Sequence, residues 1–150
     1  MQRPEHRDES SGLPEAAELP CAFAHALFAG HAACELARRR TFGEGERVAC
    51  TRAVAGMNCA TLHAMIFERC AFSLGRARRG EPPSHATAMR VQCGGLDGVR
   101  GALGATDGDV HRMVVAAQER FGGLAGLPWE AIARAVAAWR PRRRARDERT

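Results

Sequence analysis

The stretch NCATLHAMIFERC, from Asn58 to Cys70, decides how the rest of the chain is interpreted. Residues three and four positions apart share one face of a helix. Helical spacing therefore places four side chains of this stretch on one side: Cys59, His63, Ile66 and Cys70. Two thiols and an imidazole on one face are typical either of a core that contains soft residues or of a metal or redox site.

Helical signals continue on both sides of this stretch. Pro20 suits a first helical turn and the run Arg38 to Arg40 suits a last turn, which predicts a helix over residues 20–40. Periodic apolar residues predict helix from Val48 to Leu74, and Gly56 and Asn58 are candidates for dividing it into two helices.

The second half of the chain continues the same pattern. A short helix is expected around ATAMRVQC, followed by a glycine-rich loop or broken helix, and two clearer helices are expected over residues 107–120 and 128–139. No segment alternates convincingly with period two, and β-branched residues are scarce. The sequence therefore predicts an all-α fold, a small single-domain bundle of about five helices.

Composition divides the chain of 150 residues into three parts. Residues 1–18 predict a disordered N-terminal segment, residues 19–140 a single helical domain, and residues 141–150 a basic tail. The most apolar run meets a charge short of the roughly 18 residues that a membrane span needs, and no signal-peptide pattern is visible at the start. We therefore expect a cytoplasmic protein without a membrane span.

The chain is rich in Cys and His, with six of each, whereas its 22 basic residues are all Arg. Without Lys there is neither a Schiff-base lysine nor a phosphate-loop lysine. The catalytic patterns H-E-x-x-H and G-x-S-x-G are also absent, which argues against an enzyme. In a reducing cytoplasm, thiols serve as metal ligands, redox groups or core residues more often than as disulfides.

Four cysteines of the N-terminal half form the first candidate site: Cys21, Cys34, Cys50 and Cys59. Four thiolates are the usual ligands of an iron-sulfur cluster, here most simply of the 4Fe-4S type. On unbroken helices the first two would lie about 20 Å apart and the last two about 13 Å apart, too far for one cluster. The set therefore requires a bend within each interval, for which Gly30 and Gly56 are suitably placed.

A zinc site is the alternative. The spacing Cys-x-x-x-His occurs twice and supplies a mixed set of two thiolates and two imidazoles: Cys21, His25, Cys59 and His63. Cys93, beside Gly94 and Gly95, is a reserve ligand. A further reading is that these cysteines are buried and inert.

These patterns predict a small metal-binding protein with a Cys-ligated iron-sulfur centre, used in electron transfer or in redox or cofactor sensing with a protein partner. The net charge of +5 suits an acidic partner. The alternative is a helical adaptor or regulator, metal-free or zinc-binding, that binds an acidic partner or nucleic acid through its Arg patches. Nucleic acid is the less favoured of these two, because the apolar face of the last expected helix is typical of core: Trp129, Ile132, Val136 and Trp139.

Overall fold

The computed structural model describes residues 18–74 and 82–141. All but the last residue of the expected disordered segment, the Arg residues at 76–79 and nearly all of the basic tail lie outside these ranges. The described residues form a mixed α/β fold with a three-stranded antiparallel sheet, so the all-α prediction is wrong. Among the described residues, no helix combines the length and the apolar character needed to cross a membrane.

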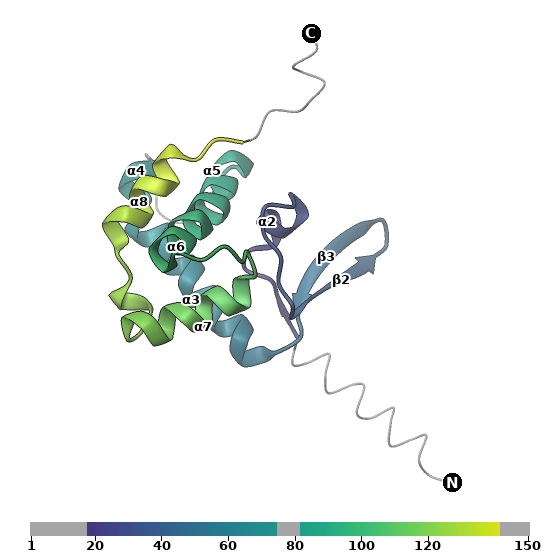
Figure 1. Cartoon of the computed structure of the whole chain (residues 1–150). Coiled ribbons are helices and arrows are strands. Elements are labelled where there is room, and N and C mark those ends of the chain that lie inside the picture. Colours follow the sequence, from purple (N-terminus) through teal and green to yellow (C-terminus); the bar gives the residue numbers. More distant parts are fainter. Residues whose placement is uncertain (1–17, 75–81, 142–150) are drawn as a thin grey trace.

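The sheet consists of β1 (Leu19–Pro20), β3 (Gly45–Cys50) and β2 (Ala37–Phe42), in that spatial order. Strands β2 and β3 form a hairpin closed by the two residues between Phe42 and Gly45. The first of these, Gly43, has φ +58°, which matches the hairpin turns that place glycine at their first central position. The hairpin extends from one side of the helical part (Figure 1).

The helix expected over residues 20–40 is replaced by a short helix and a strand. Helix α2 covers only Ala24–Phe28, and Gly30, at φ +74°, turns the chain soon after it. The arginines at 38–40, expected in a last helical turn, lie on β2 instead. The sequence of this strand does not alternate between apolar and polar residues. Its described side chains are exposed or half-buried, so few of its positions require an apolar residue.

The longest helix, α3, covers Ala53–Arg69 without a break at Gly56 or Asn58, and α4 follows at Ala71–Leu74. After the gap, one helical rod is built from α5 (His85–Met89), a π-helical segment η1 (Arg90–Gly94) and α6 (Gly95–Leu103). Ser84 caps the start of this rod by accepting a hydrogen bond from the Thr87 N–H, as its sequence position indicates.

The last two helices are those that the sequence predicts. Helix α7 covers Val110–Phe121 with Asp109 as its N-cap, and α8 covers Trp129–Ala138 after a short 3₁₀ turn, η2 (Leu124–Gly126). Within α8, Ile132 and Val136 are fully buried, which agrees with the predicted core face.

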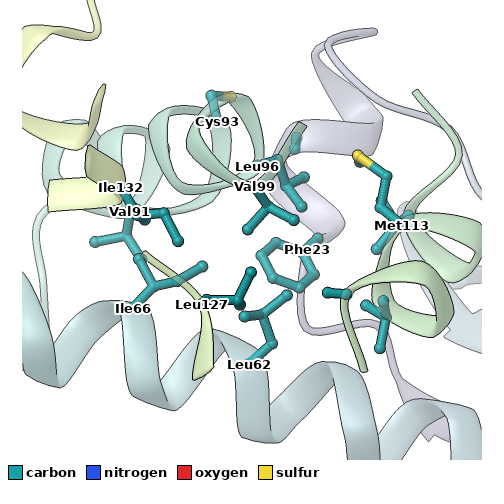
Figure 2. Packing of buried hydrophobic residues seen from close by; sticks show 14 of the residues in the cluster. Phe23, Leu62, Ile66, Val91, Cys93, Leu96, Val99, Met113, Leu127 and Ile132 are labelled. Atoms are coloured by element: carbon teal, nitrogen blue, oxygen red, sulfur yellow. The ribbon is translucent and has the colours of Figure 1, made fainter. Parts of the chain in front are cut away.

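The core lies where α3, α6, α7 and α8 meet the N-terminal segment. Figure 2 shows Phe23 among Leu62, Val99 and Met113, side chains that come from separate parts of the chain. Ile66 is fully buried and lies against Gly95. Phe28 is 41% exposed and lies under the guanidinium of Arg39. Helix α3 therefore contributes Leu62 and Ile66 to the core.

Gln92 is a buried polar residue in this core, and it connects the π-helical segment to α2. Its side-chain Oε1 accepts a hydrogen bond from the Ala26 N–H at 3.1 Å. Buried polar groups cost free energy unless they are paired, so this bond fixes α2 against the rod. Helix α2 begins three residues after Cys21, and its placement helps to position that thiol.

Candidate metal centre

The four cysteines of the first candidate set lie in four separate segments of the chain. Cys21 follows β1, Cys34 lies between α2 and β2, Cys50 ends β3, and Cys59 lies in the second turn of α3. The chain does bend between Cys21 and Cys34 and again between Cys50 and Cys59, as a common site requires. The first bend includes Gly30, but the second is the strand-to-helix turn at Thr51–Arg52 and not Gly56.

All four cysteines line one small enclosed cavity, of about 20 Å³, between the sheet and the helices. The other lining residues are small or apolar: Ala22, Ala37, Gly56 and Val110. A Cβ added at Gly56 would lie 3.1 Å from Leu19 Cδ1 and 3.4 Å from Cys50 Cβ. The glycine therefore does not break the helix but lets α3 approach the strand that carries Cys50.

Backbone groups point at two of the sulfur atoms. The backbone of Phe23 hydrogen-bonds to Cys21, and the backbones of Leu36 and His111 hydrogen-bond to Cys34, each favouring the thiolate and lowering the pKa. Hydrogen bonds to ligand sulfurs are one of the means by which proteins tune iron-sulfur clusters. The thiol of Cys50, by contrast, donates to the Arg52 carbonyl oxygen at 3.2 Å.

Burial acts in the opposite direction and is the larger effect. It raises the pKa of Cys21 and of Cys34, and it raises the pKa of Cys59 to about 12, with further contributions from the neighbouring thiolates. In the metal-free protein these thiols are therefore protonated at neutral pH. A bound cation reverses this balance, because a coordinated thiol is deprotonated.

The segment that carries Cys34 is fastened to the start of α7. Ala33 and Asp109 form a parallel bridge, in which the Val110 N–H donates to the Ala33 carbonyl oxygen at 2.8 Å. The Asp109 carboxylate accepts from the Glu35 N–H at 2.7 Å and from the Arg112 N–H at 3.1 Å. One side chain thus caps α7 and holds the residue after Cys34.

Sequence reasoning did not find this role of Asp109. The sequence predicted that this helix begins at about Asp107, which put Asp109 inside the helix and not at its N-cap. Its contact with Glu35 joins positions 74 residues apart, and no local pattern records such a contact.

The imidazoles of the mixed zinc set do not line the four-cysteine cavity. His25 is exposed, with its ring 5.3 Å from that of His85, and the ring of His63 packs edge-on against Phe23 at 5.7 Å. Burial lowers the pKa of His63. The reserve ligand Cys93 is fully buried in η1 and is also outside the cavity lining.

Among the described residues, no group of three or more His, Cys, Asp or Glu side chains is arranged so that it could hold a metal ion. The four thiols are therefore related by a shared cavity and by mutual electrostatic effects, and not by a preformed coordination sphere. None of the protein-family models, curated proteins or solved structures compared with this chain matches it.

Proposed function

We propose that this chain is a small metalloprotein in which Cys21, Cys34, Cys50 and Cys59 bind an iron-sulfur cluster. The observation that carries the proposal is the convergence of four thiols, from four segments spread over 39 positions of sequence, on one apolar cavity. Four thiolates are the ligand set of both common cluster types, and we favour 4Fe-4S.

A single ion and a cluster hold four thiolate sulfurs at different distances from one another. Four sulfurs on one zinc ion lie at about 2.3 Å from it, and therefore within about 4 Å of one another. In a 4Fe-4S cluster each thiolate binds a different iron atom, so the sulfurs stand further apart. The cavity is nevertheless small, and insertion of a cluster requires the four side chains to move outward.

That small volume supports a second candidate, a zinc ion held by the same four thiolates. About 20 Å³ is a little more than the space of one water molecule, which suits a single ion. The mixed set with His25 and His63 is less well supported, since neither imidazole lines the cavity. The metal-free adaptor rests on Arg patches, of which the one described run, at 38–40, lies on β2.

Electron transfer or redox sensing is the role that we assign to the cluster, with a protein as its partner. In a bound 4Fe-4S cluster the four cysteines would supply one ligand to each iron, which would leave no iron open for a substrate. A centre closed by protein ligands exchanges electrons more readily than it binds reactants. We therefore place this chain among electron carriers or redox sensors and not among enzymes.

Metal analysis of anaerobically purified protein tests the proposal. We expect iron and acid-labile sulfide in comparable amounts, with a broad visible absorption band. Changing any one of the four cavity cysteines to Ser should lower both contents strongly, whereas the control Cys70→Ser, at a buried position outside the cavity lining, should keep them.

Three other results would change the assignment. Stoichiometric zinc without sulfide, lost in all four Ser variants, would establish the single-ion site. Metal lost in His25→Ala and His63→Ala but kept in Cys34→Ser and Cys50→Ser would establish the mixed zinc set. A colourless protein that takes up neither metal after reconstitution with iron, sulfide or zinc would refute both metal proposals.

A further inference from the structure

The end of α8 lies beside the start of the helical rod (Figure 1). An open hollow of about 410 Å³ lies between them, and we call it the Arg90 hollow. Its apolar walls include Met89, Trp139 and Pro141, and its two charged residues are Arg90 and Arg140. None of the described residues that line it is an Asp or a Glu, and none lines the four-cysteine cavity. Its size and composition are typical of sites for small molecules.

Both arginines of this hollow are held at one carbonyl group. Arg90 Nη2 donates to the Ala137 oxygen at 2.6 Å, and Arg140 Nη1 donates to the same oxygen at 3.1 Å. Arg140 also donates to the Trp139 carbonyl oxygen at 2.8 Å. These oxygens lie at the C-terminal end of α8, where the helix dipole attracts cations. The structure therefore fixes two guanidinium groups next to each other in the lining of the hollow.

No carboxylate of the described residues forms an ion pair with either arginine. Asp97 lines an adjoining hollow that Arg140 also lines, but its carboxylate lies 2.8 Å from His31 and 3.9 Å from Arg100. Arg90 Nε is buried and has no acceptor in the described part of the chain. Two neighbouring cations without a counter-charge attract an anion. The planar N–H groups of a guanidinium match a carboxylate, which they can bind through two hydrogen bonds.

Close packing of the rod against α8 makes this hollow a fixed feature of the fold. Arg90 begins η1, and π-helical turns inside α-helices occur frequently at functional sites. Four residues later, a Cβ added at Gly94 would lie 2.8 Å from the Cα of Val136. Backbone thus packs against backbone next to the hollow, and its two walls cannot move closer together. Most sites for small molecules are preformed in this way.

We propose that the Arg90 hollow binds a small aromatic carboxylate. The carboxylate of the ligand pairs with Arg90 and Arg140, and its ring packs against Trp139 and Met89. An indole ring favours contact with another aromatic ring, and a thioether sulfur packs well at a ring edge. None of these residues is a cavity cysteine, so the proposal does not depend on a bound metal.

Isothermal titration calorimetry of the full chain with 2-naphthoate tests this proposal, and we expect one site per chain. Two further probes separate the contributions of ring and charge. The first, 2-naphthalenemethanol, keeps the ring but is uncharged, and inorganic phosphate is an anion without a ring. Each should bind at least about tenfold more weakly than 2-naphthoate, because each lacks one of the two interactions. Equal affinity for 2-naphthoate and either of the other probes would overturn the inference.

Variants locate the bound anion. Arg90→Met should weaken 2-naphthoate binding by about tenfold, because a charged hydrogen-bond donor is lost. This change also removes a contact with α8, so Arg140→Ala, at an exposed position, is the second variant and should weaken binding by about threefold or more. The control Arg134→Ala removes the same charge from an exposed position of α8 that lines neither hollow, and it should bind as the wild type does. Equal losses in Arg134→Ala and Arg140→Ala would show only a general effect of net charge and would overturn the site.

The two Trp residues of the chain provide a readout of position. In NMR spectra of ¹⁵N-labelled protein, 2-naphthoate should shift the indole N–H resonance of Trp139 and leave that of Trp129, which is not in the lining, nearly unchanged. The opposite result would place the ligand elsewhere and would overturn the inference. Protein with and without metal should give the same affinity, so a failure of the metal proposals would leave this result unchanged.

Discussion

At the scale of single residues, two glycines of α6 differ in what surrounds them. A Cβ added at Gly98 would lie 2.9 Å from the Cα of Ile132 in α8, whereas a Cβ at Gly101 would meet nothing within 4 Å. Gly98→Ala should therefore lower the free energy of unfolding by about 1–3 kcal/mol, because backbone must move to make room. Gly101→Ala should raise it by up to about 1 kcal/mol through helix propensity. Urea denaturation of both variants checks the prediction, and a destabilised Gly101→Ala would contradict this account of the packing.

The Cys59 thiol should make the metal-free protein sensitive to alkali. Folding raises its pKa to about 12, whereas an unfolded thiol titrates near about 8.5. Between these values the folded state holds the proton that the unfolded state loses, so the stabilisation is complete below about pH 8.5 and is lost as the pH rises toward 12. Reduced metal-free protein should therefore be less stable in urea at pH 10 than at pH 7.

The variant Cys59→Ala isolates this contribution. Its unfolding free energy should fall less between pH 7 and pH 10 than that of the wild type, since the variant lacks the thiol whose pKa is raised by folding. Met57→Ala, at a 59% exposed position on the same helix, should show the wild-type pH dependence. An unchanged slope in Cys59→Ala would mean that other groups cause the alkaline loss.

At the scale of elements, the β2–β3 hairpin depends on its turn. Gly43 has φ +58° and an added Cβ would meet nothing within 4 Å, so a substitution there costs backbone strain and not a clash. Gly43→Ala should lower stability by about 1–2 kcal/mol. The matched change Glu44→Ala should be nearly neutral, because no described non-glycine residue has a positive φ. Hydrogen exchange of the β3 amides measures both, and equal protection in the two variants would contradict the proposed strain.

The elements that the sequence predicted are those whose apolar residues repeat with a helical period and face the core. Helices α7 and α8 were found within a few residues of their ends, and α3 was found as part of a longer helical region. The sheet was missed because only Val48 and Cys50 of β3 are buried, which leaves no alternating pattern to detect. The glycine at position 43 was a usable turn signal, but the Arg run before it also suited a helix end.

At the scale of the whole molecule, residue types identified the candidate site, but contacts between distant segments determine its geometry. Cysteine type and the need for two bends suggested one set of four thiols among several alternatives, and these four line one cavity. The second bend was expected at Gly56, which lies within the unbroken α3. The side of α3 that faces Cys50, and the attachment of Cys34 to α7 through Asp109, depend on long-range contacts. The spacing of apolar residues in the sequence indicates which residues are buried, but it does not indicate which segments of the chain contact one another.

Because Asp109 joins the Cys34 segment to α7, replacing it should affect both folding and metal retention. Asp109→Ala removes the helix cap and leaves the Glu35 N–H without its 2.7 Å acceptor, so the metal-free protein should lose about 1–2 kcal/mol of stability. If the protein binds a cluster as proposed, the variant should also release it faster to an iron chelator, since metal affinity is coupled to folding around the ligands.

A matched variant separates these two effects of Asp109. Glu119→Ala removes an exposed carboxylate near the other end of α7 and should change neither the stability nor the release rate appreciably. If Asp109 acted only as a cap, Asp109→Ser, which can still cap α7, would restore the stability and the slow release together. We expect it to restore much of the stability but not the slow release, because the shorter hydroxyl cannot hold both Arg112 and Glu35 as the two carboxylate oxygens do. Chelator kinetics and urea midpoints measured on the same preparations decide between these outcomes.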